Sequence, residues 1–206
     1  MMSLRKQLRK YFIMGSQNCD RDPVETLREA ISAGITAFQY REKGDGALTG
    51  KTKLELGKML REICAAHQVP FIVNDDIELV EQLQADGIHV GQEDLSVREV
   101  RQMFPDKIVG LSVSNIHELK QSPLSFVDYI GAGPMYDTST KSDAKSAVGV
   151  QWIQFLRMQF PDLPIVGIGG INTQNASLVI QAGADGVSVI SAITKAPNIK
   201  DAVEKL

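Results

Sequence analysis

The sequence has few cysteines: its 206 residues contain two, Cys19 and Cys64. Two thiols are too few for a disulfide-stapled domain, and their separation does not match the paired spacing of a zinc site. A long apolar run is also missing. Residues 11–14, which follow the basic N-terminus, are too short for the core of a signal peptide, and no run reaches the length of a membrane span. These absences predict a cytoplasmic protein with no export signal and no membrane as a partner.

An excess of one charge is absent too. Lys and Arg number 22 and Asp and Glu number 25, which gives a formal net charge of -3, and the basic residues are spread evenly. Since duplex nucleic acid requires a basic stripe, it is not expected as a partner. Apolar residues make up 43% of the chain, which argues against disorder, and the length suits one core better than two. We expect a single domain over residues 1–206 that acts on small molecules and can form a homo-oligomer.

Apolar, strand-like runs alternate with segments of helical period along the whole chain. Strands are predicted at residues 11–14, 35–40, 71–73, 87–90, 108–112, 129–132, 165–168 and 186–190. Helices are predicted at residues 23–33, 50–67, 77–84, 96–104, 116–121, 150–160, 173–181 and 198–206. Turn chemistry agrees, because Asp22 and Pro23 can cap and start a helix, and Gly34 and Gly183 can end one.

This alternation of strands and helices, without a change in composition, predicts an α/β fold, a single (β/α)8 TIM barrel. A doubly wound open sheet is the alternative. Such sheets usually have fewer units and a GxGxxG fingerprint after the first strand, which residues 15–18 (Gly-Ser-Gln-Asn) do not supply. The longest segment without a predicted element, 133–147, is rich in Thr, Ser, Asp and Lys, and such a segment in a compact barrel is typically functional.

Polar residues follow one predicted strand after another at its C-terminal end. The clearest case is the apolar run 69–73, which breaks off into Asn-Asp-Asp at 74–76. The preceding strand runs into Gln-Tyr-Arg-Glu-Lys at 39–43, and the following strand into Gly-Gln-Glu-Asp at 91–94. In a parallel barrel the C-terminal strand ends surround one mouth, so we expect these segments to be neighbours in the fold.

Two kinds of ligand suit these strand ends. Gln39, Arg41 and Lys43 stand at alternate positions, so they share one side of the strand and can point together at an anion. Asp75 and Asp94 suit Mg²⁺, which takes one or two protein carboxylates and completes its octahedron with water and phosphate oxygens.

Simpler structural roles compete with these assignments. Asp75, Asp76 and Asp94 all precede predicted helices, where a carboxylate can cap the first turn and favour the helix dipole. We expect Asp76 to cap the helix or to support its neighbours, and Asp75 and Asp94 to bind metal. His89 lies inside a strand-like run, and we expect it at a satisfied position of the barrel interior rather than as a base or a ligand.

Two further loops have the chemistry of a phosphate site. Residues 138–141 (Thr-Ser-Thr-Lys) place hydroxyls and an ammonium in a row. Residues 166–170 (Val-Gly-Ile-Gly-Gly) lack large polar side chains, so backbone amides can approach a phosphate there. Phosphate sites at the seventh and eighth loops are common in TIM barrels, and we therefore expect the strand end at 190–191 to take part.

Six segments, in this order, resemble the thiamine phosphate synthase family. They are residues 39–43 (QYREK), 73–76 (VNDD), 87–94 (GIHVGQED), 133–141 (with GP at its start and TSTK at its end), 166–171 (VGIGGI) and 186–191 (GVSVIS). One such motif is a weak signal, but six in series cover nearly the whole chain. The resemblance implies a TIM barrel that requires Mg²⁺. It also implies a transferase that joins 4-amino-2-methyl-5-hydroxymethylpyrimidine diphosphate to 4-methyl-5-(2-hydroxyethyl)thiazole phosphate and releases diphosphate.

The resemblance further implies roles for single residues, with Asp75 and Asp94 holding the metal. The pyrimidine diphosphate would be contacted by Gln39, Tyr40, Arg41, Glu42, Lys43, Asn74, Ser112 and Lys141. The thiazole phosphate would be contacted by Thr138, Ser139, Thr140, Gly170, Ile190 and Ser191. Arg41, Lys43 and Lys141 would act in catalysis by neutralising the departing diphosphate. The pyrimidine cation proposed for the family needs no protein nucleophile, and the sequence offers no persuasive catalytic triad.

Two other functions stay open. The related thiazole tautomerase branch shares the fold but has a His after a Ser-Val pair, where this chain has Ser114. The isomerase is therefore less expected. A phosphate-metabolite binding protein that kept the phosphate loops and lost turnover is not excluded by the sequence.

Overall fold

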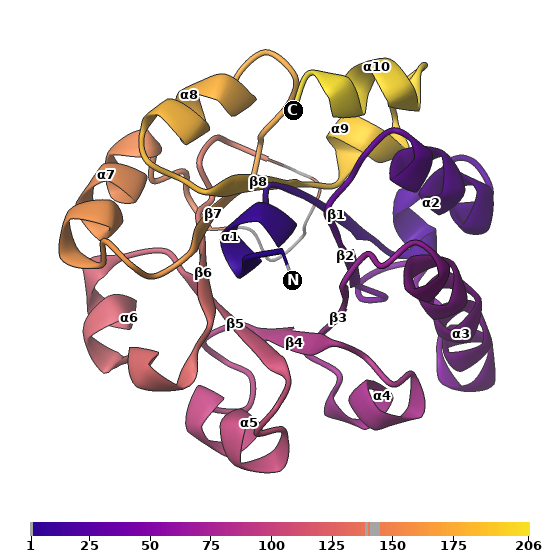
Figure 1. Cartoon of the computed structure of the whole chain (residues 1–206), viewed down its shortest axis with the longest axis horizontal. Helices are drawn as coiled ribbons and strands as arrows, with labels where there is room; N and C mark the ends of the chain where they lie inside the picture. Colours follow the sequence, from indigo (N-terminus) through magenta and orange to yellow (C-terminus); the bar gives the residue numbers. More distant parts are fainter. Residues whose placement is uncertain (1, 139, 141–144) are drawn as a thin grey trace.

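The computed structural model describes residues 2–138, 140 and 145–206. Parallel strands form a closed barrel in chain order, with the last strand paired to the first. They are β1 (Lys10–Met14), β2 (Ala37–Tyr40), β3 (Phe71–Asn74), β4 (Gly87–Val90), β5 (Ile108–Val113), β6 (Tyr129–Ala132), β7 (Ile165–Ile168) and β8 (Gly186–Val189). Figure 1 shows the helices as an outer ring around these strands. The predicted (β/α)8 barrel is confirmed, and its closed sheet excludes the doubly wound alternative.

Every predicted helix is present. They are α2 (Pro23–Ser32), α3 (Gly50–Ala66), α4 (Ile77–Gln82), α5 (Val97–Met103), α6 (Ile116–Gln121), α7 (Val150–Gln159), α8 (Ala176–Gln181) and α10 (Ile199–Glu204). The sequence did not reveal the short helices α1 (Leu4–Gln7) and α9 (Ser191–Thr194) or the 3-10 turns η1 (Ser16–Asn18) and η2 (Leu124–Phe126). Helix α8 starts later than predicted because Asn172 and Asn175 form a turn, in which the Asn172 side chain accepts from the Gln174 amide at 2.8 Å.

Side-chain caps explain where several helices begin. Asp22 accepts from the Glu25 amide at 2.9 Å and Pro23 occupies the first turn of α2, as the sequence predicted. Ser96 and Glu99 form a reciprocal capping box at the start of α5. Such caps satisfy amides that a helix leaves without a partner, and each typically contributes about 1 kcal/mol.

Two apolar regions stabilise the barrel. The larger lies between strands and helices and buries large side chains such as Phe12, Phe38 and Phe71. The smaller fills the barrel interior with Leu8, Tyr11, Ala37, Ile72, Tyr129 and Val166. Leu4 of α1 packs against this interior cluster, and Figure 1 shows α1 over the centre of the ring. Since α1 immediately precedes β1, it closes the N-terminal end of the barrel and leaves the C-terminal end for chemistry.

An aspartate before each of three even-numbered strands braces the N-terminal end. Asp86 accepts from Arg61 and the Phe71 amide, at 3.2 and 2.8 Å. In the same way, Asp128 accepts hydrogen bonds from Arg101 and from the Val109 amide. Asp185 accepts from Arg157 and from the Ile165 amide. Before β2, the Thr36 hydroxyl accepts from the Lys10 amide at 2.8 Å instead. This bracing lies at the end of the barrel away from the strand ends that carry the predicted site.

Glycines in the strands make room for polar rings in the interior. A Cβ on Gly110 would come within 2.2 Å of the Tyr129 ring, and one on Gly131 within 3.0 Å of the His89 ring. The interior of β5 and β6 is therefore shaped to hold these two side chains.

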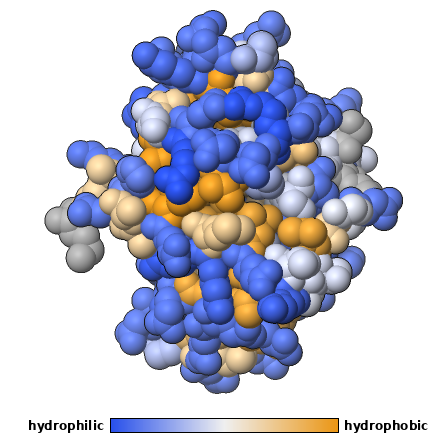
Figure 2. Space-filling view, turned by 90° about the vertical axis from the view of Figure 1, so that its right-hand side faces the viewer, coloured by the Kyte–Doolittle hydropathy of each residue, from blue (hydrophilic) through white to orange (hydrophobic). Residues whose placement is uncertain are grey.

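The outer helices turn polar residues outward. Figure 2 shows the side of the molecule on which α2 and α3 lie, where hydrophilic side chains cover most of the face and apolar ones lie among them. None of the described helices combines the length and the apolar character that crossing a bilayer requires.

Candidate active site

A chain of buried polar side chains crosses the barrel interior. Gln39 Nε2 donates at 2.8 Å to the Tyr11 hydroxyl, which lies 2.9 Å from the Tyr129 hydroxyl. The Tyr129 hydroxyl lies 2.9 Å from His89 Nδ1, and His89 Nε2 lies 2.8 Å from Ser112 Oγ. Burial raises the pKa of both tyrosines, so they remain neutral. His89 thus occupies a satisfied interior position, as predicted, and the network fixes the orientation of Ser112.

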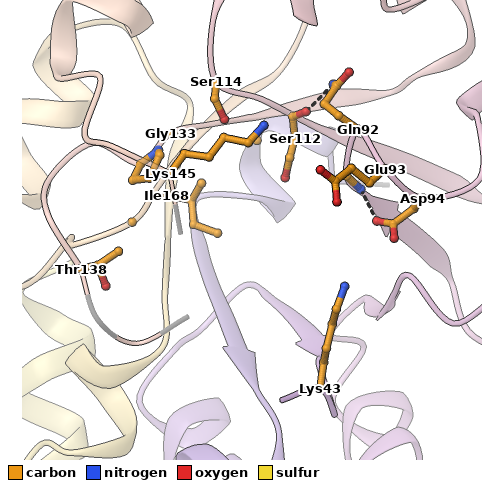
Figure 3. A pocket seen from close by; sticks show the side chains of 14 residues that line it. Lys43, Gln92, Glu93, Asp94, Ser112, Ser114, Gly133, Thr138, Lys145 and Ile168 are labelled. Carbon is orange, nitrogen blue, oxygen red and sulfur yellow. Dashed lines mark hydrogen bonds between the residues drawn. The ribbon is translucent and has the colours of Figure 1, made fainter. Parts of the chain in front are cut away.

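A cavity of about 220 Å³ opens at the C-terminal strand ends. It is lined by Lys43, Gly91, Gln92, Glu93, Asp94, Ser112, Ser114, Gly131, Gly133, Pro134, Thr138, Lys145, Ile168 and Gly169. Figure 3 shows Lys43 and Asp94 on one side of this cavity and Lys145, Ser114 and Thr138 on the other. Residues at the ends of β2, β4, β5, β6 and β7 therefore meet at one mouth, as the polar strand ends predicted.

Alternate residues at the end of β2 face opposite sides, as their spacing predicted. Gln39 points into the barrel, Lys43 lines the cavity, and Arg41 between them is buried at the strand end. Tyr40 points the other way and donates its hydroxyl to the Lys53 carbonyl at 2.8 Å. Of the predicted anion-binding side chains at this strand end, Lys43 lines the cavity, whereas Gln39 is bonded inside the barrel and Tyr40 points outward.

Glu42 also points away from the cavity. Its carboxylate accepts from the Ser16 amide at 2.8 Å, from the Ser16 hydroxyl and from the Leu48 amide at 2.7 Å. The resemblance implied that Tyr40 and Glu42 contact the pyrimidine diphosphate, but the structure does not bring them into the cavity, because the strand alternation directs them outward. Glu42 instead fixes the loop from which Lys43 projects.

Two carboxylates meet where β3 and β4 end. Asp75 has a φ of 60°, a left-handed conformation that few residues other than glycine adopt, and its carboxylate lies 2.5 Å from Lys43 Nζ. Asp94 accepts from the Gly91 amide at 2.7 Å. Burial, with a further contribution from the neighbouring Asp75, raises the pKa of Asp94. The hydrogen bond to Asp75 raises the pKa of Lys43, so this ammonium stays charged beside the two carboxylates.

This donor set fits Mg²⁺. Two carboxylates that lie close together repel each other unless positive charge lies near them. In the part of the chain that the structure describes, no three or more His, Cys, Asp or Glu side chains gather into a metal cage. Mg²⁺ does not require a cage, since it usually takes one or two carboxylates and keeps water and phosphate oxygens as its other ligands. Mg²⁺ at Asp75 and Asp94 is compatible with this arrangement and stays a prediction.

The competing cap roles receive little support. Helix α5 is capped by Ser96, which leaves Asp94 free of that task. Asp76 stands at the N-cap position of α4 but makes no side-chain capping bond, and its carboxylate pairs with Lys53 Nζ at 2.6 Å. Of the two expected roles of Asp76, its side chain does not make the capping hydrogen bond, and its ion pair with Lys53 is the supporting one.

A smaller cavity of about 30 Å³ lies at the ends of β7 and β8 and shares Thr138, Ile168 and Gly169 with the first. Of the residues predicted for the thiazole phosphate, it is lined by Thr138, Thr140, Gly170, Ile190 and Ser191. Gly170 has a φ of 65°, and a Cβ there would lie 2.7 Å from Tyr136, so only glycine suits this position. The short helix α9 begins at Ser191, and TIM-barrel phosphate sites frequently include the N-terminus of a short extra helix after the eighth strand.

The predicted site residues and the residues that line the cavity are not the same set. Ser139 and Lys141 lie outside the described residues. Asn74 ends β3 beside Asp75, and its predicted ligand contact stays a prediction. Sequence reasoning missed Gln92 and Lys145, although both lie in segments already singled out as functional. Their positions in the cavity follow from loop conformations that no periodicity predicts.

Known proteins similar to this chain agree with one another. The family model described as thiamine monophosphate synthase matches residues 10–193. The chain belongs to the thiamine monophosphate synthase family. It is 64% identical over 202 residues to the thiamine-phosphate synthase of Oceanobacillus iheyensis, covering 98% of each chain. It is 51% identical to that of Bacillus thuringiensis subsp. konkukian, covering 98% of this chain and 93% of the relative.

A solved structure extends the similarity to three dimensions. The thiamine phosphate pyrophosphorylase of Pyrococcus furiosus superposes with a TM-score of 0.87 at 31% identity, covering 99% of this chain and 96% of that one. The chain is therefore an enzyme of the thiamine monophosphate synthase family, a transferase, and the family resemblance inferred from its motifs is confirmed.

Proposed function

We propose that this enzyme joins 4-amino-2-methyl-5-hydroxymethylpyrimidine diphosphate to 4-methyl-5-(2-hydroxyethyl)thiazole phosphate, with Mg²⁺ at Asp75 and Asp94, and releases diphosphate. The observation that carries the proposal is the pairing of two adjoining cavities. One has carboxylates and Lys43 at its rim, and the other has hydroxyls and glycine backbone of the kind that binds a phosphate. A reaction between two phosphorylated substrates needs such a pair.

Loss of diphosphate builds negative charge on the leaving group, so groups that bind this charge speed the reaction. Lys43 stands at the cavity with an ammonium already beside Asp75, and Arg41 is buried at the same strand end. Bound Mg²⁺ would supply Lewis-acid stabilisation of the diphosphate, typically worth several kcal/mol. Lys141 is proposed to contribute a further positive charge.

The remaining residues act by orientation. Ser112, held by His89, projects from β5 into the same cavity. Thr138, Thr140 and Ser191 place hydroxyls where the thiazole phosphate is proposed to bind. The C–O bond to diphosphate breaks first, its electron pair leaves with the diphosphate, and the thiazole nitrogen, held in place by these residues, then attacks the pyrimidine methylene cation. No protein nucleophile is required.

The test is diphosphate release from purified enzyme supplied with both substrates and Mg²⁺. Asp75→Asn and Asp94→Asn should each lower kcat by at least about 10³-fold, since a metal Lewis acid contributes several kcal/mol. Asparagine tolerates the left-handed backbone of residue 75, so this substitution tests charge rather than folding. Asp76→Asn is the matched control, because its carboxylate pairs with Lys53 outside the cavity. Turnover that persists in excess chelator would refute the metal-dependent mechanism.

The alternative functions predict different outcomes. A phosphate-metabolite binding protein would bind both substrates and form no diphosphate. A thiazole tautomerase would convert its thiazole substrate without any pyrimidine diphosphate present.

A further inference from the structure

Lys145 lies in the main cavity without a role in the proposed reaction. Its side chain is 51% exposed and lines the cavity together with Ser112 and Ser114. Figure 3 shows its ammonium nitrogen on the side of the cavity where these two serines lie. Lys145 precedes α7 and Lys43 follows β2. Because β2 and β6 stand opposite each other in the closed barrel, the two lysines approach the cavity from different sides.

Glu118 of α6 holds this ammonium in place. Its Oε1 lies 2.6 Å from Lys145 Nζ, and the Glu118 side chain is 11% exposed. Glu118 also accepts from the Ser114 amide at 2.8 Å and from Asn115 Nδ2 at 2.6 Å. Burial raises the pKa of Glu118, but the ammonium and the other two donors outweigh burial and leave this pKa below its ordinary value. Glu118 is therefore an ionised, fixed anchor.

The anchor leaves part of the ammonium available. A lysine ammonium has three N–H donors, and Glu118 is the acceptor that the described residues provide for Lys145. The backbone of Gly131 and Gly133 lines the cavity nearby and adds no bulk. An anion in this cavity can thus accept from Lys145 while Lys145 stays on Glu118.

The charges around the cavity favour this arrangement. Asp94 and Glu93 line its other side, where Lys43 is already paired with Asp75. A diphosphate bound beside these carboxylates needs positive charge on its far side as well. We infer that Lys145 is a further substrate-binding residue, whose ammonium binds the diphosphate group across the cavity from Lys43 and is positioned by Glu118. The inference rests on the proposed function, because it names a ligand of the same site.

The test measures binding of inorganic diphosphate to the intact enzyme in the presence of Mg²⁺ by calorimetry. Lys145→Met should raise the Kd by about tenfold or more, the effect of losing one charge-assisted hydrogen bond. Lys145→Arg keeps the charge and should stay within about threefold of the wild type, because guanidinium also binds phosphate. Lys200→Met is the matched control, since Lys200 is an exposed lysine of α10 paired with Glu204. Lys145→Met binding diphosphate as tightly as the wild type would overturn the inference.

A second variant separates binding from a merely structural tie between loops. If Lys145 only braced its loop through Glu118, then Glu118→Gln would weaken diphosphate binding as much as Lys145→Met, and that result would overturn the inference. We expect Glu118→Gln to stay within about threefold of the wild type, because the glutamine carbonyl oxygen still accepts from the ammonium and keeps it in position. The KM for the thiazole phosphate should not change in Lys145→Met. Wild-type enzyme that binds no diphosphate at all would refute the proposed function and this inference together.

Discussion

The hydrogen-bonded pair of tyrosines inside the barrel gives a sharp test of how the site is supported. The Tyr129 hydroxyl lies between the Tyr11 hydroxyl and His89 Nδ1, at 2.9 Å from each, and both tyrosines are almost wholly buried. Tyr129→Phe removes this hydroxyl with little change in volume. Two buried polar atoms then lose a partner, and leaving such an atom unsatisfied costs about 1–3 kcal/mol.

Working from these contacts, we expect Tyr129→Phe to lower the free energy of unfolding by about 3 kcal/mol, because both neighbours are affected. For a chain of this size that corresponds to a fall in Tm of roughly 6–12 °C. Tyr11→Phe should have a similar effect, since it deprives Gln39 Nε2 and the Tyr129 hydroxyl of the same partner. The effect is measured by urea unfolding of each variant followed by circular dichroism.

The double variant Tyr11→Phe/Tyr129→Phe decides whether the two hydroxyls act on each other. Their shared hydrogen bond is lost in either single variant, so the double variant should cost less than the sum of the two by about 1–2 kcal/mol. Tyr136→Phe serves as a control, because the described residues provide no hydrogen bond to its hydroxyl. Additive losses, or single losses below about 1 kcal/mol, would show that the interior network does not stabilise the barrel as argued.

Three further predictions concern the rest of the molecule. Asp128→Ala should lower the free energy of unfolding by about 2 kcal/mol, because the Arg101 guanidinium and the Val109 amide lose their acceptor, and calorimetry should show unchanged diphosphate affinity. Burial raises the pKa of Cys64 to about 12 and of Cys19 to about 11, so iodoacetamide at neutral pH should label neither in the folded enzyme and both in denaturant. The lowered pKa of Glu118 stabilises the fold above the ordinary glutamate pKa, and this contribution is lost as the pH falls through the folded-state value. Urea midpoints of the wild type and Glu118→Gln should therefore converge on acidification.

The barrel was predictable because the spacing of apolar residues and the positions of capping and turn-forming residues indicate the same elements along the chain. Each strand places apolar residues on both faces, as expected for a sheet covered by helices outside and filled by side chains inside. Helix ends were predictable where a side chain forms the cap, as at Asp22. The start of α8 was less predictable, because the side chains of Asn172 and Asn175 form a turn ahead of the helix. Helix α1 was missed because its four residues make only about one turn, which is too short to show a helical spacing of apolar residues.

The aspartate bracing was also missed, although its signal is in the sequence. Ala85-Asp86-Gly87-Ile88, Val127-Asp128-Tyr129-Ile130 and Ala184-Asp185-Gly186-Val187 share one pattern of apolar residue, aspartate, any residue and β-branched residue. Each aspartate lies just before a strand, where its carboxylate accepts from an amide in the first two residues of the preceding strand. Comparing the residues that precede every second predicted strand would have found it.

The site was predictable at its strand ends and less so in its loops. Regular backbone makes side chains alternate, so the sequence predicted that Gln39 and Lys43 point away from the side of Tyr40; Lys43 lines the cavity, whereas Gln39 bonds to Tyr11 inside the barrel. The motif match alone, however, grouped Tyr40 and Glu42 with them, because sequence similarity does not distinguish a residue that touches a ligand from one that supports its neighbour. Glu42 binds the amides of Ser16 and Leu48 and so fixes the loop that carries Lys43.

The same distinction applies across the cavity, at Lys145. In the absence of ligand, a lysine that only supports a loop and a lysine that binds the ligand can make the same contacts. The two roles differ in how diphosphate binding responds when the partner, here Glu118, is changed. Glu118→Gln removes the anchor's charge and leaves the ammonium, whereas Lys145→Met removes the ammonium and leaves the anchor with its Ser114 and Asn115 donors. Comparing the two variants therefore separates support from binding, which neither sequence motifs nor side-chain contacts can do.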